Sequence, residues 1–467
     1  MRILGGIMRS LGLRSSAPGD VWPGDMLRER VELVAAQTWK LLADETRWVH
    51  RRVEKIALID DRRVHRHTSV DFTMPHLARS GDGAVDLIPL SLVHKEVLRD
   101  LDVRDEEGNA LPVLTREQNA TIAGAILVQQ ASVTLEELGD GTGVNEELRA
   151  DLKSIAGERS HEDAELFSDE AVRQWALLLD DPTMSGLLTD FEKQFILFAD
   201  ARTAPGQRRV LKFSYEQAFD QPPRGGGVLS RLWGGSKRKA HNLLESLGLR
   251  SFRAGVGVTA MLDAESYHVE VAPPEDAVIS FAQLVRIEEI PEEDDGGASQ
   301  ERRVVLDTAV GPGRVHLYTS EAHPSATTWS LLEVYFRLRA GVLWPVFLIS
   351  AVTSGLFGAG LYLHSIDVPA RADAAAALIV ALPAFFAPAV APGGHALVRR
   401  MFRGLRVLVW VSALLSFVAG ASLAVDLSAS TMERAWWVLL AISSLLTIIA
   451  GLSLLFSTKK STSPSDA

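Results

Sequence analysis

The sequence predicts an α+β protein in which β-rich cytoplasmic modules with a helical insert are followed by a C-terminal four-helix transmembrane bundle. Four long apolar segments after residue 337 predict the bundle, and alternating strand patterns on both sides of a helical stretch predict the rest. The formal charge of the chain changes sign at the same place. The chain from Arg337 onward carries a formal charge of +5 and residues 1–336 carry −16, which together give −11 for the whole chain.

The composition excludes several classes of protein. A chain of 467 residues with 47% hydrophobic and 23% charged residues is typical of folded proteins. The absence of cysteine excludes thiolate nucleophiles, Cys-ligated zinc and iron–sulfur clusters. The acidic balance of residues 1–336 argues against nucleic-acid binding, which requires a basic surface.

The predicted spans are recognised by their length and their lack of charge. A helix needs about 20 residues to cross the hydrocarbon core of a bilayer. No Asp, Glu, Lys or Arg occurs inside the four segments, and few helices of soluble proteins are apolar on every face. The lipid bilayer is therefore a predicted partner. The spans are predicted at residues 340–363, 374–397, 407–425 and 435–456.

The connections between the spans predict which side of the membrane each one occupies. Lys and Arg cluster on one side, whereas the opposite connections contain only Arg371 and Arg434 together with acidic residues. The positive-inside rule assigns the basic side to the cytoplasm, so both termini and residues 1–336 are predicted to be cytoplasmic. The membrane-orienting residues are Arg337, Arg339, Arg399, Arg400, Arg403, Arg406, Lys459 and Lys460.

The second span differs from the others. Pro383, Pro388 and Pro392 predict a kinked or broken helix, because proline removes a backbone donor and clashes with the preceding turn. Broken helices line substrate sites in transporters, and they also occur as simple packing bends. In the first span, Ser354 and Gly358 have the spacing that lets helices approach closely, within one chain or between copies in a homo-oligomer.

The region before the spans is too long for one hydrophobic core, and changes in pattern divide it. A helix is predicted from Asp25, with apolar residues at three- and four-residue steps as far as Ile56. Two segments are expected to be mobile loops, the basic 221–241 and the acidic 291–301. The predicted regions are a basic flexible N-terminus (1–24), a helix with a β-rich module (25–115), the helical insert (116–206), a second β-rich module (207–338), the spans (339–457) and a cytoplasmic tail (458–467).

Strands within the modules are predicted from period-two alternation and from turns. Residues 70–74 alternate apolar and polar side chains, and Glu106–Asn109 is a turn between strands. Thr115 and Gln118 form a capping box that starts a helix, and helical signals continue to about Ala201. Further strands are predicted at 85–93, 97–105, 211–215, 256–262, 267–271, 278–285, 304–306, 315–319 and 329–338.

No group of residues in the sequence indicates a specific chemistry. His65 and His67 lie on one face of a strand with a spacing that can hold a metal ion, but spacing fixes no third ligand nearby, and neighbouring arginines would repel a cation. The acidic residues from Asp100 to Glu107 lack the spacing of a calcium loop. No nucleophile-elbow, metalloprotease, kinase or phosphate-loop motif occurs. We therefore assign no catalytic, cofactor-binding or metal-binding residue.

Four short phrases resemble sequences in a group of actinobacterial membrane proteins that have a large cytoplasmic region and four spans. These phrases are residues 69–75, 101–108, 111–115 and 266–271, and they belong to strands and turns rather than to catalytic motifs. The excess of Arg over Lys suits a bacterium with a GC-rich genome. The resemblance implies location in a bacterial inner membrane, and it implies no activity and no functional residue.

These features favour a non-catalytic protein that presents a sensor or protein-docking module on the cytoplasmic face of the membrane, where protein partners would bind. The alternative is an oligomeric channel or transporter gated by the cytoplasmic region, with the proline-containing second span in its pathway. Neither hypothesis requires a cofactor or a nucleic acid, and an enzyme without a recognisable motif stays open as a third hypothesis.

Overall fold

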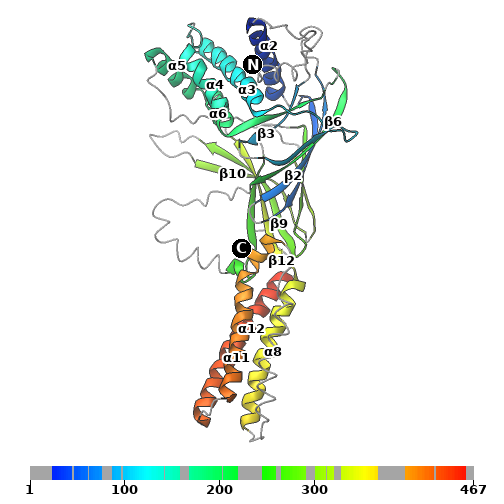
Figure 1. Cartoon of the computed structure of the whole chain (residues 1–467), viewed down its shortest axis with the longest axis vertical. Coiled ribbons are helices and arrows are strands. Elements are labelled where there is room, and N and C mark those ends of the chain that lie inside the picture. Colours follow the sequence, from blue (N-terminus) through cyan, green and yellow to red (C-terminus); the bar gives the residue numbers. More distant parts are fainter. Residues whose placement is uncertain are drawn as a thin grey trace.

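The structure is a computed structural model that describes most of the 467-residue chain. A β-rich part with a group of helices stands on three long helices (Figure 1). The last strand of the β-rich part is separated from the first long helix by Arg339 alone. The described residues are 24–44, 47–60, 63–75, 87–95, 98–140, 142–157, 168–201, 203, 205–218, 244–258, 264–290, 300–311, 313–319, 328–365, 395–424 and 428–458.

The first described helix is shorter than the sequence predicts. Helix α2 covers Gly24–Ala43, and strand β1 (Val49–Leu58) occupies the last part of the segment expected to be helical as far as Ile56. The prediction is wrong there because Arg52 and Glu54 are buried on the inward side of β1. These two charged residues interrupt the apolar alternation of the strand, so the remaining apolar spacing imitates a helix.

One six-stranded sheet joins strands from both ends of the sequence that precedes the apolar helices. Its order is β11–β8–β1–β2–β6–β4, in which β1 and β8 are parallel and the other neighbours are antiparallel. The strands expected in modules 25–115 and 207–338 share this sheet, because Arg51 of β1 pairs with Ser266 of β8. The bounds are β2 Arg63–Thr73, β4 Arg99–Arg104, β6 Arg208–Ala218, β8 Ser266–Ala272 and β11 Val315–Thr319.

A four-stranded antiparallel sheet lies next to the long helices, with the order β10–β9–β12–β7. A third sheet consists of β3 and β5 alone. Every strand predicted between residues 211 and 338 overlaps a described strand. The remaining bounds are β3 Leu87–His94, β5 Gln194–Asp200, β7 Phe252–Val258, β9 Ala277–Ile290, β10 Gln300–Ala309 and β12 Thr328–Leu338.

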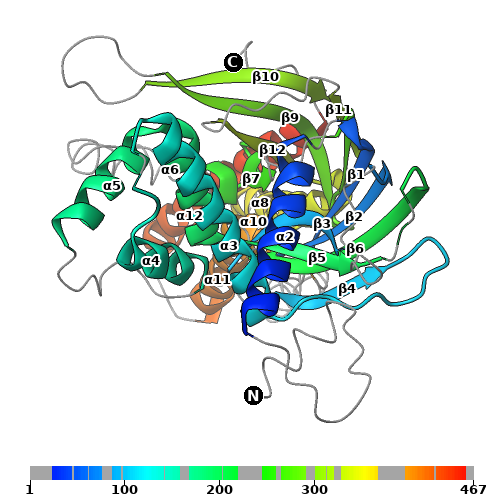
Figure 2. The ribbon, with the colours of Figure 1, turned by 90° about the horizontal axis from the view of Figure 1, so that it is seen from above.

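The helical insert lies to one side of the sheets (Figure 2). Its predicted start is confirmed, since the Thr115 hydroxyl accepts from the Gln118 N–H at 3.3 Å and the Gln118 side-chain oxygen accepts from the Thr115 N–H at 2.8 Å. Its predicted end at Ala201 is wrong, because Gln194–Asp200 forms the buried strand β5. A continuous apolar run does not distinguish a buried strand from a helix. The helices are α3 Arg116–Glu137, α4 Glu146–Ala156, α5 Asp169–Asp180 and α6 Pro182–Lys193.

Three of the four predicted spans are present as helices long and apolar enough to cross a membrane. They are α8 (Ala340–Ser365), α11 (Arg403–Ala424) and α12 (Ala429–Thr458), called the apolar helices below. Other expected features lie outside the described residues: span 374–397 up to residue 394 with Pro383, Pro388 and Pro392, residues 1–23, the loop 221–241, most of the loop 291–301, and the tail from Lys459 and Lys460 onward.

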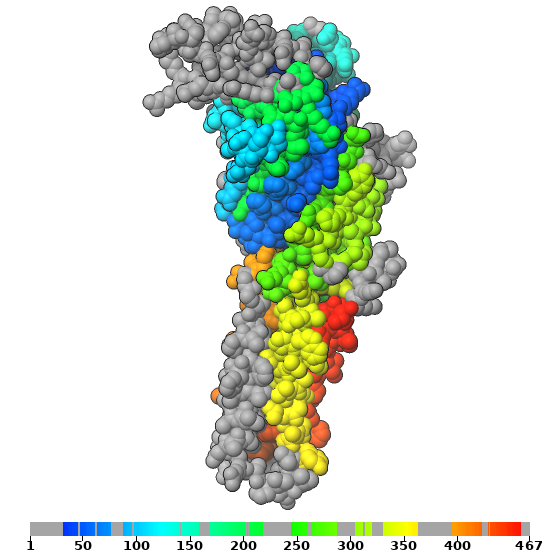
Figure 3. All heavy atoms as spheres, turned by 90° about the vertical axis from the view of Figure 1, so that its right-hand side faces the viewer, coloured from blue at the N-terminus to red at the C-terminus, as the bar shows by residue number. Residues whose placement is uncertain are grey.

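The apolar helices have the polarity of membrane helices rather than of a soluble bundle. Trp410, Leu414 and Phe417 of α11 are 60–74% exposed, whereas Ser412 and Ser416 of the same helix are buried. Each buried hydroxyl donates to the carbonyl oxygen four residues earlier. Apolar side chains outside and small polar ones inside suit a lipid environment. Figure 3 shows α8 in yellow and α12 in red below the strands of the six-stranded sheet in blue.

Candidate functional site at the junction of the sheets and the apolar helices

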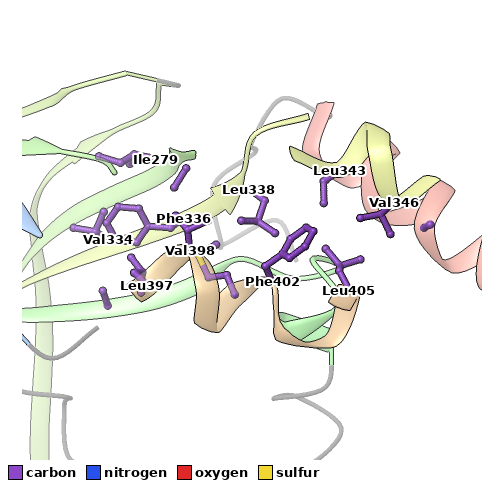
Figure 4. Close-up of a cluster of buried hydrophobic side chains, with 14 of the residues drawn as sticks. Ile279, Val334, Phe336, Leu338, Leu343, Val346, Leu397, Val398, Phe402 and Leu405 are labelled. Atoms are coloured by element: carbon purple, nitrogen blue, oxygen red, sulfur yellow. The ribbon is translucent and has the colours of Figure 1, made fainter. Parts of the chain in front are cut away.

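A single hydrophobic core runs from the sheets into the apolar helices. The labelled side chains in Figure 4 come from β9 and β12, from the short helix α10 (Ala396–Met401) with Phe402 at its end, and from the first two turns of α8 and the first turn of α11. Because the core is continuous, the two parts of the molecule are packed as interiors are, without a flexible connection between them at these residues. The labelled members are Ile279, Val334, Phe336, Leu338, Leu343, Val346, Leu397, Val398, Phe402 and Leu405.

His395 joins helix α10 to the end of strand β1. Its Nδ1 atom accepts a hydrogen bond from the Leu397 N–H at 3.2 Å, which caps the N-terminus of α10. Its Nε2 atom lies 2.9 Å from the carbonyl oxygen of Leu58. Since Nδ1 is the acceptor, we assign the proton to Nε2, which then donates to Leu58.

Arg337 makes a second connection, between the end of β12 and the end of α12. Its Nε donates to the Ser251 hydroxyl at 3.0 Å, and its Nη1 donates to the Phe456 carbonyl oxygen at 3.3 Å. The guanidinium also lies 4.2 Å from the centre of the Phe456 ring, a cation–π geometry. Burial lowers the pKa of Arg337.

The segment Leu244–Ser251 makes a third connection by packing on the ends of α11 and α12. The Ser453 hydroxyl of α12 donates to the Leu247 carbonyl oxygen at 2.6 Å. Gly404 of α11 lies so close to this segment that a Cβ there would be 2.6 Å from the hydroxyl oxygen of Ser246. Only glycine permits this approach.

The structure gathers the described membrane-orienting arginines at this junction. Arg337 and Arg339 precede α8, and Arg399, Arg400, Arg403 and Arg406 lie on α10 and the first turn of α11. Arg400 has a structural contact, since its guanidinium lies 5.4 Å from the centre of the Phe252 ring. Arg399 and Arg403 are exposed. Lys459 and Lys460 lie beyond the described part of the chain.

A buried charged belt, which the sequence does not predict, lies between two hydrophobic clusters of the six-stranded sheet. The Nη1 atom of Arg66 lies 3.0 Å from Oε1 of Glu54, and both side chains are almost fully buried. The Tyr267 hydroxyl donates to the other oxygen of Glu54. The belt consists of Arg52, Glu54, Arg66, Tyr215 and Tyr267.

The belt connects the six-stranded sheet to both of the other sheets. Arg66 of β2 donates to the Gly257 carbonyl oxygen of β7, and Arg52 of β1 donates to the Leu90 carbonyl oxygen of β3. Burial acts to lower the pKa of Arg66, but the Glu54 charge together with Tyr215 and Tyr267 outweighs burial, and the pKa is raised. Burial and Glu54 raise the pKa of Tyr267 well above its ordinary value, so its hydroxyl stays a donor. In the sequence, the signal for this belt is the occurrence of polar residues at alternate strand positions, where a buried strand face usually carries apolar residues.

The remaining sequence candidates do not form a site for an ion. His65 and His67 share the outward face of β2, where burial together with Lys55 and His65 lowers the pKa of His67. Among the residues that the structure describes, no three His, Asp or Glu side chains are grouped so that they could hold a metal ion. In the acidic hairpin, Asp105 accepts from the backbone and side-chain amides of Asn109, which closes the turn.

Comparisons with known proteins leave these sites without a precedent. No protein-family model matches the chain, and no curated protein is significantly similar to it.

Proposed function

We propose that this chain is a multi-pass protein of a bacterial inner membrane that presents a cytoplasmic, non-catalytic sensor or protein-docking module. The module is coupled to the spans, so that binding of a partner to the sheets and movement of the helices affect one another. The resemblance to actinobacterial proteins with four spans agrees with this setting. Protein partners at the cytoplasmic face and assembly into homo-oligomers are part of the proposal.

The observation that carries the proposal is the continuous core at the junction. A docking module on a passive anchor needs only a linker, whereas here Val334 and Phe336 of β12 share one hydrophobic cluster with Leu343 of α8 and Leu405 of α11. The hydrogen bond from His395 to Leu58 adds a polar connection at the same level. Packed interiors transmit displacement because they have low compressibility. The junction therefore favours a sensor over a passive anchor.

The directions of the helices support four spans. The Ser354 and Ser444 hydroxyls are 3.0 Å apart, and the Phe357 and Trp436 ring centres are 6.0 Å apart, so α8 and α12 are antiparallel. The Trp436 indole donates to the Ser422 hydroxyl at 3.3 Å, so α11 ends where α12 begins. Helices α8 and α11 therefore both run away from the junction. A span at 374–397 would return the chain to the junction, and the positive-inside rule would then assign both termini to the cytoplasm.

The channel alternative depends on water or ions reaching polar groups inside the bundle. Among the described residues of the bundle, Ser412 and Ser416 each donate to the carbonyl oxygen four residues earlier, and the Ser453 hydroxyl lies within hydrogen-bond distance of the Leu247 and Ile449 carbonyl oxygens. The buried Ser350 hydroxyl of α8 has no hydrogen-bond partner among the residues that the structure describes, but one isolated hydroxyl does not form a path for ions. Hydroxyls satisfied within their own helix support helix packing rather than a conducting path. We therefore keep the sensor as the proposed function.

A distance measurement across the junction tests the coupling. The chain contains no cysteine, so spin labels can be placed at Tyr318→Cys on β11 and Val407→Cys on α11, both exposed positions. Double electron–electron resonance in nanodiscs should give one narrow distance distribution. A pair within the soluble part, Tyr318→Cys with Val113→Cys, provides the reference width. A distribution much broader across the junction than within the soluble part would contradict the coupling.

Partner binding is tested separately with the full-length protein. A pull-down from membranes should enrich a partner over a variant that contains only the spans, or a ligand screen should shift the melting temperature. If the pull-down enriches no partner and no ligand shifts the melting temperature while the junction is rigid, the sensor and docking function is contradicted. The proposal would then keep only the anchoring of the fold in the membrane.

A further inference from the structure

Helix α10 and the first turn of α11 carry three arginines on one face. The backbone N–H of Phe402 donates to the Val398 carbonyl oxygen at 2.8 Å, and the Arg406 N–H donates to the Phe402 carbonyl oxygen at 3.0 Å. Helical hydrogen bonding thus continues across the boundary between α10 and α11. Residues spaced by four, three and four positions share one face of a helix. Arg399, Arg403 and Arg406 have that spacing, and Trp410 continues it.

The same face continues as an exposed apolar surface of α11. Below the arginines it continues through Trp410, Leu414 and Phe417, of which Trp410 is 74% exposed. An exposed tryptophan at the end of an apolar helix surface is typical of the boundary between hydrocarbon and headgroups. Arg406 lies about one turn above Trp410, at the depth of the lipid headgroups. Arg403 and Arg399 lie about two and three turns above Trp410, at the outer edge of the headgroup layer and beyond it, where they face the phosphate groups from the aqueous side.

Arg399 and Arg403 are exposed and Arg406 is half-buried, whereas the neighbouring Arg400 stacks on Phe252. The described segments 340–365 and 395–424, which include α8, α10 and α11, contain no Asp or Glu. Among the described residues, Arg399 and Arg403 form no ion pair and are exposed. The close packing of Gly404 against Ser246 holds the same turn in place on another side.

We propose that Arg399, Arg403 and Arg406 form a binding surface for the headgroup of an anionic phospholipid in the leaflet next to the soluble part. Guanidinium groups pair with phosphate through two parallel hydrogen bonds, which suits this partner better than a neutral headgroup. The inference rests on the membrane placement under the proposed function. A lipid bound there would contact the junction directly, through α10.

The test is native mass spectrometry of the full-length protein in detergent, titrated with phosphatidylglycerol or with phosphatidylcholine. A basic residue near an anionic surface contributes roughly fivefold in affinity, so the wild type should prefer phosphatidylglycerol by at least about tenfold. The variant R399Q/R403Q/R406Q should bind the two lipids within about twofold of each other. The variant R399K/R403K/R406K keeps the charge and should retain most of the preference.

A matched control removes the same charge elsewhere: R47Q/R104Q/R208Q changes three exposed arginines of the soluble part, and it should keep the wild-type preference. Equal binding of both lipids by the wild type, or an unchanged preference in R399Q/R403Q/R406Q, would overturn the inference. So would displacement of phosphatidylglycerol by inorganic phosphate at equal concentration, or retention of an acidic protein on this face in place of lipid.

The result also separates this inference from the proposed function. A wild-type protein that stays in solution without detergent would overturn both. A protein that requires detergent but does not distinguish the two lipids would overturn only the lipid-binding surface.

Discussion

The Nε2 atom of His395 lies 2.9 Å from the carbonyl oxygen of Leu58, although the two residues are 337 positions apart in the chain. One residue precedes the helix that leads into α11, and the other ends the first strand of the six-stranded sheet. The imidazole uses both nitrogens, one to cap the helix and the other to hold the strand. A single side chain thus ties the sheet to the apolar helices.

Substitution of His395 should separate its two contacts. His395→Asn keeps a capping oxygen but is too short to reach Leu58, so it should cost about 1 kcal/mol. His395→Ala loses both contacts and should cost about 2 kcal/mol. Thermal unfolding in detergent compares the stability losses of the two variants. Hydrogen exchange at residues 57–60 should rise in both variants. The exposed His316→Ala is the control, and an equal effect there would contradict the role of His395.

The buried charged belt should be intolerant of losing one partner. Glu54→Gln leaves Arg66 buried without its anion and should destabilise the fold by about 3–5 kcal/mol. The double change Glu54→Leu with Arg66→Met should be less harmful than Glu54→Gln, because it removes both buried charges. Chemical denaturation measures the free energy of unfolding of both variants.

A surface ion pair provides the comparison for the belt. Glu270 lies 3.4 Å from Lys55 and 3.0 Å from Arg314, whose side chains are 56% and 67% exposed, so Glu270→Gln should cost at most about 1 kcal/mol for each pair. If Glu54→Gln were as mild as Glu270→Gln, the belt would not hold the sheets together.

Asp190 on α6 should make stability depend on pH. Burial raises its pKa to about 6, so the folded state binds its proton more tightly than the unfolded state does. The resulting stabilisation is complete below the unfolded pKa of 3.8 and is lost as the pH rises through about 6. Asp190→Asn should therefore be more stable than wild type at pH 7, by on the order of 1–2 kcal/mol after discounting for partial exposure.

Denaturation curves from pH 4 to pH 7.5 test this expectation. The difference between Asp190→Asn and wild type should grow across the interval from about pH 4 to pH 6. Glu192→Gln, an exposed change on the same helix, is the control. A constant difference over the whole range would show that Asp190 does not titrate in this way.

Two glycines of α8 should respond differently to alanine. At Gly360 an added Cβ would overlap the Trp436 ring of α12, so Gly360→Ala should weaken helix packing by about 1–3 kcal/mol. At Gly355 nothing lies within 4 Å of the added atom, so Gly355→Ala should be neutral or slightly stabilising. The melting temperatures of the two variants are compared in the same detergent. Equal melting temperatures would contradict the packing of α8 against α12.

The sequence predicts those features that depend on neighbouring residues. The capping box of Thr115 and Gln118, the later strands and three apolar helices follow from local spacing and hydrophobicity. Local patterns fail at Val49–Leu58, where buried charges hide the strand period, and at Gln194–Asp200, where burial on both sides removes it. Both errors arise because the partner that decides the structure lies far away in the chain.

Only the tertiary structure decides which distant residues meet. The sequence by itself determines that an acidic region is followed by apolar helices with arginines at their ends. It does not contain the parallel pairing of β1 with β8, the contact of Arg66 with Glu54 and Gly257, or the capping of α10 beside Leu58. Such contacts depend on the path of the whole chain, because residues that are far apart in the sequence meet by closing a long loop. A contact of this kind produces no local periodicity in the sequence that would predict it.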